Sequence, residues 1–140
     1  MKKKRLDIEY SYDFELLGVI SSAKGYKLAW DINNRLGVRL VKQPDVIIQF
    51  NNNIMGTYAH FSHESPLNRL KLLRNKPNEA DAAKNLLVPE FPHIDYVVSS
   101  QGADKFDINH LQDYLRSISS VELVAFIPLD TLKSKDYFIF

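Results

Sequence analysis

The chain contains no cysteine, and this absence excludes disulfide bonds, thiolate metal sites and a cysteine nucleophile. It has five scattered glycines, none of which builds a G-x-G or Walker-type loop for phosphate groups. A G-x-S-x-G nucleophile elbow is also missing. The familiar motifs of nucleotide-binding proteins and hydrolases therefore give no support to an enzyme.

Long hydrophobic runs and a charge excess are absent as well. No apolar stretch approaches the ~18 residues that a membrane-spanning helix needs. The basic start, Met1 to Arg5, is followed by alternating and acidic residues rather than by the apolar core of a signal peptide. The net charge of +1 supplies no overall field that would hold a polyanion. We therefore expect a cytoplasmic protein without membrane contact, and the lack of cysteine suits a reducing compartment.

What is present is typical of one globular domain over residues 1–140. Hydrophobic side chains make up 45% and charged side chains 25% of the chain, far from the composition of disordered proteins. In the first part, Phe14, Leu17 and Ile20 fall on one helical stripe. After a break at Lys24-Gly25, a second helical pattern continues to Leu36. This part of the sequence predicts an N-terminal helical hairpin.

The middle of the chain changes to a period of two. Val46–Phe50, Ile54–Phe61 and Leu70–Leu72 alternate between apolar and polar residues, and short polar turns separate them. This pattern predicts a meander of three antiparallel strands. Leu6 to Tyr10 shows the same alternation and predicts a further short strand.

The last third mixes both periods. Ile108, Leu111, Leu115 and Ile118 share one stripe of a predicted helix, and the dense apolar run Val121–Ile127 predicts a central strand. The apolar tail, residues 137–140, is expected to pack on the domain or on a partner. The predicted fold class is α+β, a twisted antiparallel sheet with the helical hairpin and the later helix packed mainly on one face.

The stretch Leu86 to Gly102, LLVPEFPHIDYVVSSQG, is the most unusual in the chain. Its two prolines disfavour helix for the residues before them and predict a bend around Glu90. Glu90 and Asp95 point to opposite sides along an extended chain, so we predict a structural corner. There the two carboxylates accept hydrogen bonds from backbone amides or pair with a nearby arginine. A catalytic carboxylate pair is the competing hypothesis.

The same stretch resembles the signature of the IPExxxVDY family, a group of small bacterial proteins of unknown function. The matching residues are Pro89, Glu90, Asp95 and Tyr96. Valine stands at position 88 where the family has isoleucine, and isoleucine at position 94 where it has valine. The family carries no assigned activity, cofactor or catalytic residue. The resemblance therefore implies a bacterial cytoplasmic protein and leaves its mechanism open.

Two histidines, His60 and His63, lie close together in sequence and raise the question of a metal site. In a continuous strand they would point to opposite faces, so the sequence predicts no metal site and no cofactor. His93 and His110 are single histidines without an identifiable nucleophile or orienting acid beside them in sequence.

Basic residues offer a further binding surface. Arg69, Lys71, Arg74 and Lys76 are a candidate nucleic-acid contact, a weak basic stripe on a chain of nearly neutral charge. The only tryptophan, Trp30, is expected to be a core residue or an interface anchor.

These observations rank three functions. The leading hypothesis is a non-enzymatic protein-interaction domain, which contacts another protein or itself as a homodimer. It is supported by the aromatic tail, the seven tyrosines and the absence of a chemical motif. An RNA-associated accessory protein that uses the basic stripe is the second hypothesis, and an enzyme with an unrecognised site is the third.

Overall fold

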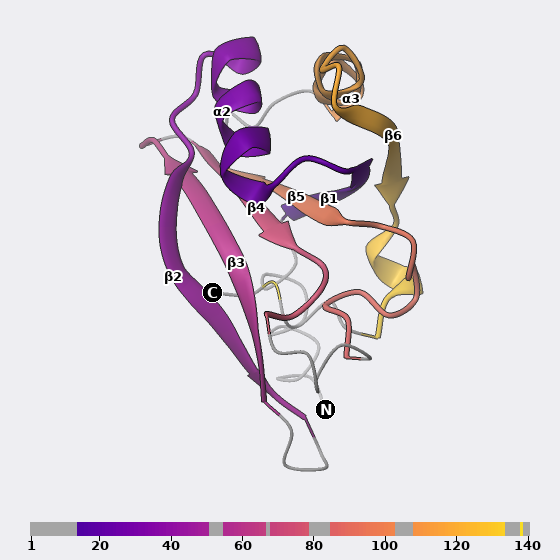
Figure 1. The fold of residues 1–140 in the computed structure, drawn as a ribbon. Helices are drawn as coiled ribbons and strands as arrows, with labels where there is room; N and C mark the ends of the chain where they lie inside the picture. Colours follow the sequence, from indigo (N-terminus) through magenta and orange to yellow (C-terminus); the bar gives the residue numbers. More distant parts are fainter. Residues whose placement is uncertain are drawn as a thin grey trace, which may run out of the picture.

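The computed structural model describes residues 14–50, 55–66, 68–78, 85–102, 108–133 and Phe138. Within these residues six strands form one antiparallel sheet, and two helices pack against it (Figure 1). The elements, in chain order, are β1 (Phe14–Ser21), α2 (Gly25–Leu36), β2 (Val41–Gln49), β3 (Met55–Glu64), β4 (Asn68–Arg74), β5 (Tyr96–Gly102), α3 (Ile108–Arg116), β6 (Val121–Ile127) and the short 3-10 helix η2 (Leu129–Thr131). The α+β class and the antiparallel sheet are confirmed.

The strands follow the order β2-β3-β4-β5-β1-β6. The first three strands of this order are the predicted meander of residues 46–72, which is therefore confirmed in place and direction. β4 then pairs with β5, and β1 lies between β5 and β6. β2 and β6 form the two outer edges of the described sheet, at opposite sides of the molecule (Figure 1).

The predicted N-terminal helical hairpin is wrong. Residues 14–21 form β1, and the helix that follows it, α2, stands alone. β1 buries side chains on both faces, so its nearly continuous apolar run fits a buried strand as well as a helical stripe. Gly18 marks a close approach within the strand, because a Cβ atom at this position would overlap the side chain of Ile94. α2 itself ends at Gly37, whose φ of 70° is left-handed, as its position in the sequence predicts.

The prediction that Val121–Ile127 is a central strand is also wrong. Among the described residues β6 pairs only with β1 and lies at the edge of the sheet. Only Val124 and Ile127 are buried along it. A dense apolar run, which is typical of a central strand, therefore lies at the edge of this sheet.

The sheet has a helix face and a loop face. On the helix face, Leu28 and Ile32 of α2 pack with the sheet in one core. Leu111 and Leu115 of α3 belong to the same core. Ile118, just after α3, also belongs to it, as the predicted helical stripe requires. On the loop face the cover comes from residues 85–94 and from the segment after β6. The loop-face core includes these buried residues: Phe14, Leu16, Tyr58, Leu73, Leu87, Val88, Ile94, Val97, Ile127, Leu132 and Phe138.

The predicted packing of the tail is met at the one tail residue that the structure describes. Phe138 is buried, and its ring centroid lies 6.5 Å from that of Phe14. The predicted strand at residues 6–10 and the basic residues 2–5 lie outside the described residues. None of the described helices is long and apolar enough to cross a membrane.

Candidate functional site

Asp95 of the signature stretch ties two strand ends together. Its Oδ2 atom accepts a hydrogen bond of 2.9 Å from the backbone amide of Ser21, the last residue of β1. The Ser21 hydroxyl in turn donates to the carbonyl of Ser120, directly before β6, at 2.8 Å. Asp95 therefore acts through Ser21 on the position where β6 begins.

Glu90 binds the backbone beyond the other end of β6. Its Oε2 atom accepts a hydrogen bond of 2.6 Å from the backbone amide of Lys133, two residues beyond η2. The expected corner is confirmed in this respect, because both carboxylates accept from backbone amides. Asp95 accepts from the amide of Ser21, beside the start of β6, and Glu90 accepts from the amide of Lys133, beyond its end.

Tyr96 and Pro89 complete the matched signature residues. Tyr96 opens β5 with its ring in the helix-face core, and its hydroxyl donates to the carbonyl of Ala23 at 2.6 Å. Burial raises the pKa of this hydroxyl, and the nearby Asp95 carboxylate adds to the rise while Arg74 opposes it. Pro89 is exposed at the bend, whereas the preceding Val88 is fully buried.

Asn75 holds the inner side of the corner and was missed by the sequence analysis. This side chain is completely buried, accepts from the amide of Val88 at 2.6 Å and donates to the carbonyl of Ile94 at 2.8 Å. Its own amide donates to the carbonyl of Asp95 at 2.9 Å. The sequence feature that could have indicated this role is an asparagine directly after an apolar strand, since its side chain can replace a backbone hydrogen-bond partner in a loop.

His60 and His63 lie on opposite faces of the sheet, as strand alternation predicts. His60 pairs with Leu73 on the loop face and is buried, and its pKa is lowered to about 4. Burial is the main cause, and the positive charges of Lys71 and Lys42 lower the pKa further. His63 accepts from the amide of Arg39 at 3.1 Å. Among the described residues no three His, Cys, Asp or Glu side chains gather as a metal site would require.

The candidate basic stripe is divided between the two faces of β4. Arg69 and Lys71 share the loop face, whereas Arg74 pairs with Tyr96 on the helix face and Lys76 lies beyond the strand. Lys71 is buried, and its pKa is lowered by burial first and by the charge of Arg69 second. The structure therefore does not bring the four cations together on one surface.

The remaining single residues of interest lie at the surface. Trp30 is 59% exposed on α2, so the predicted core role is wrong; Lys27 places its Nζ atom 4.4 Å from the centroid of the indole ring. His93 and His110 are exposed.

The edge formed by β2 is interrupted. A β-bulge makes Pro44 and Asp45 stand opposite the single residue Ala59 of β3. Proline has no amide proton to offer to a further strand, and the bulge twists the backbone out of line. Ile47 is 61% exposed on this strand, but it lies beyond the interruption.

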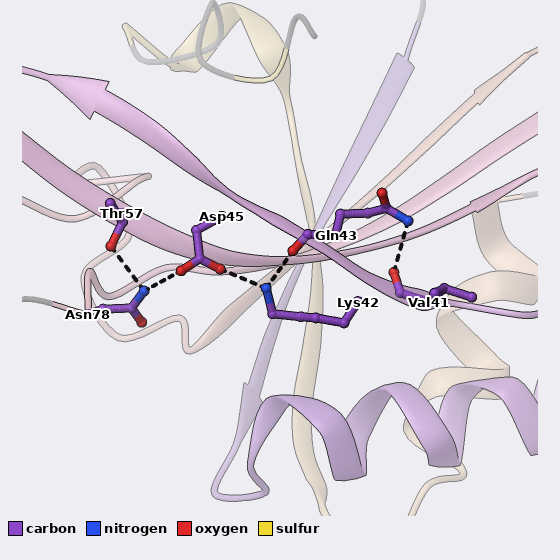
Figure 2. Close-up of polar contacts among 6 residues, drawn as sticks. All are labelled: Val41, Lys42, Gln43, Asp45, Thr57 and Asn78. Atoms are coloured by element: carbon purple, nitrogen blue, oxygen red, sulfur yellow. Dashed lines mark hydrogen bonds and ion pairs between the residues drawn. The ribbon is translucent and has the colours of Figure 1, made fainter.

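Polar side chains also cover the interruption (Figure 2). Lys42 lies 2.7 Å from Asp45, which accepts from Asn78 at 2.9 Å, and the Asn78 amide group reaches the hydroxyl of Thr57 at 3.0 Å. This chain of contacts fixes the bulge to β3 and to the loop after β4. β2 therefore carries several of the features by which natural proteins prevent strand addition.

The edge formed by β6 has no proline, and its register with β1 shifts only near its start, where Glu122 is an extra residue between Val121 and Leu123. Its sequence, VELVAFI, contains one charged residue, Glu122, and no proline or glycine. Leu123, opposite Ile20, is 47% exposed on the loop face, and Phe126, opposite Leu17, is 45% exposed on the helix face. One side chain reaches the strand from α3: Arg116 donates to the carbonyl of Val124 at 3.2 Å. Apolar side chains thus flank this open edge on both faces.

No protein-family model matches the chain, and a search of curated proteins finds no match. The resemblance to the IPExxxVDY family therefore stays a prediction, carried mainly by the signature at residues 88–96.

Proposed function

We propose that the protein is a non-enzymatic interaction domain whose β6 edge pairs in antiparallel fashion with β6 of a second copy. The observation that carries this proposal is the mismatch between the sequence and the position of β6. Its composition is that of a central strand, but in one chain it lies at an edge. Pairing with a second β6 would place it in the middle of a continuous sheet and would cover Leu123 and Phe126.

A second copy fits this edge better than a different partner does. One carboxylate, Glu122, is the only charge that β6 offers, so the strand carries no pattern that would select an oppositely charged protein. An antiparallel strand pair is self-complementary about a two-fold axis, the commonest symmetry of soluble oligomers. Because β2 at the opposite edge is interrupted, pairing at β6 stops at two copies instead of growing into a filament.

The signature residues support this edge from inside the chain. Asp95 holds the start of β6 through Ser21, and Glu90 holds the backbone of Lys133 beyond its end. In this proposal the corner positions an edge for pairing and carries out no chemistry.

Sedimentation velocity over a range of protein concentrations tests the proposal. Wild-type protein should form a dimer, and L123K or F126K should raise the dissociation constant at least about tenfold by placing charge at the pairing edge. I47K places the same charge on the other edge strand, at a more exposed residue, and should leave association within about twofold of wild type. A wild type that stays monomeric up to about 1 mM, or equal effects of all three substitutions, would contradict the proposal.

RNA binding is the weaker alternative for this chain. Its four candidate cations lie on two faces of β4 and beyond it, and Lys71 is buried. Salt-dependent retention on immobilised RNA would favour this alternative, because counterion release makes such binding fall steeply with salt.

A further inference from the structure

A groove of about 620 Å³ opens beside the start of α2, on the helix face of the sheet and away from β6. This volume lies in the range of sites for small organic molecules. The groove is lined by residues from the turn before α2, from the start of α2, and from β2, β3, β4 and β5: Ser22, Ala23, Lys24, Gly25, Tyr26, Lys42, Ala59, Phe61, Arg74 and Tyr96.

Flat apolar surfaces form much of the wall. Phe61 and Tyr96, both largely buried, line the groove with Ala59 of β3, and the Lys42 ammonium lies 5.9 Å from the centroid of the Phe61 ring. Gly25 keeps the groove open at the start of the helix. A Cβ atom at this position would lie 3.1 Å from Cε1 of Phe61 and 3.8 Å from Cε1 of Tyr96.

The charge of the lining has one sign. Lys24, Lys42 and Arg74 contribute to it, and no aspartate or glutamate does. Lys42 is engaged with Asp45 at 2.7 Å. Within the described part of the chain, neither the Lys24 ammonium nor the Arg74 guanidinium forms an ion pair or a side-chain hydrogen bond. Two cations are therefore available to a ligand at the rim of an aromatic groove.

We propose that this groove binds a small organic anion in which a planar aromatic body carries a carboxylate or phosphate group. The body lies against Phe61 and Tyr96, and the anion is held by Arg74 and Lys24. A guanidinium donates two parallel hydrogen bonds to a carboxylate or phosphate, which gives orientation as well as affinity. The first turn of α2 has no acidic residue, so no carboxylate of that turn opposes the negative charge.

Amide chemical shifts measured by NMR during titration with four probes test the charge requirement. Naphthalene-2-carboxylate and AMP carry the anion, and 2-naphthol and adenosine are their neutral counterparts. Each anion should bind at least about tenfold more tightly than its counterpart and should shift the amides of Gly25 and Tyr26. Stronger binding of AMP identifies a phosphate ligand and stronger binding of the naphthoate identifies an aromatic acid, and both support the proposal.

Matched arginine variants test the location. R74Q should weaken binding of the preferred anion about tenfold, while R69Q, on the same strand but the opposite face, should stay within about twofold of wild type. A59L should fill the groove and weaken the anion and its neutral counterpart alike. The proposal is overturned if no probe binds at millimolar concentration, if neutral probes bind as tightly as anions, or if R69Q weakens binding as much as R74Q. None of these results depends on dimer formation, because β6 lies at the far edge of the sheet.

Discussion

The two edges of this sheet differ in how strongly they are obstructed, although each carries a bulge. β2 has a proline, a bulge and a network of polar side chains fixed to neighbouring loops (Figure 2). β6 has seven residues with one charge and exposed apolar side chains on both faces. Unpaired strand edges promote association, and proteins that must stay monomeric obstruct them. Because the bulge of β6 lies near its start at Glu122 and the strand continues without proline to Ile127, we infer that this edge is used.

The edges also differ in how they are held. The proline, the bulge and the Lys42–Asp45 pair of β2 come from the strand itself, and Asn78 binds Asp45 from 33 residues away. β6 is positioned by distant residues: Asp95 lies 74 residues from the Ser21 amide that it binds, and Glu90 lies 43 residues from Lys133. The signature stretch therefore belongs to the β6 side of the molecule, and the following changes separate the two edges experimentally.

The largest expected effect comes from Tyr96, which serves the core that both edges share. Y96A should lower the free energy of unfolding by about 3–5 kcal/mol, because it removes a large buried ring. Y96F keeps the ring, loses only the hydrogen bond to Ala23 and should cost about 1 kcal/mol. Urea denaturation measures both values. A loss below about 1 kcal/mol for Y96A would show that the corner is not structural.

Acid should act on the β2 side, where His60 pairs with Gln43 directly beside the bulge. The pKa of His60 is about 4 in the fold and about 6.5 in the unfolded chain, so the unfolded state binds the proton first as pH falls. The free energy of unfolding should therefore fall by on the order of 3 kcal/mol as pH falls from about 6.5 to 4. Above about pH 6.5 His60 is neutral in both states and has no such effect. Lys71, Lys42 and Asp45 are the charged groups that act on the imidazole.

Denaturation curves measured at several pH values check this expectation. H60Q should remove the acid-dependent loss in that pH range, whereas H110Q, a change at an exposed histidine, should retain it. An identical pH dependence of stability in wild type and H60Q would contradict the assignment to His60.

Removing the proline of β2 should reduce the difference between the edges. P44V restores an amide donor on this strand at a cost to stability of about 1 kcal/mol or less. With both edges able to pair, association should continue beyond the dimer and give larger species at high concentration. Sedimentation velocity would detect them, and a P44V protein that stops at the same size as wild type would show that proline is not the obstruction.

The smallest effect is expected from Glu90. E90Q keeps an acceptor for the Lys133 amide, so the free energy of unfolding should fall by about 1 kcal/mol or less. The dissociation constant of the dimer should rise about twofold to fivefold, since the end of β6 is held less firmly. If E90Q is stable and associates like wild type but does not support the function of the protein in cells, Glu90 would instead be a catalytic or ligand-binding residue.

The sequence predicts elements well where side-chain alternation is regular and poorly where a segment is buried on both faces. The meander of residues 46–72 follows from alternation alone. β1 was mistaken for a helix because its apolar residues face two cores, and periodicity does not distinguish that pattern from a helical stripe.

Positions within the sheet and the contacts of the corner depend on long-range pairing. The local sequence of β6 carries no information on its neighbours, so its edge position could not be predicted. The two prolines predicted the bend and the roles of Glu90 and Asp95, but the buried Asn75 that closes the corner lies outside the signature stretch.

Amide hydrogen exchange measured at low and high protein concentration tests the use of the β6 edge most directly. If β6 pairs with a second copy, exchange of the outward-facing amides in Val121–Ile127 should slow at least about tenfold once the protein is dimeric. Exchange in Val41–Gln49 of β2 should not change with concentration. Concentration-independent exchange in β6, or equal protection of both edges, would contradict pairing through β6.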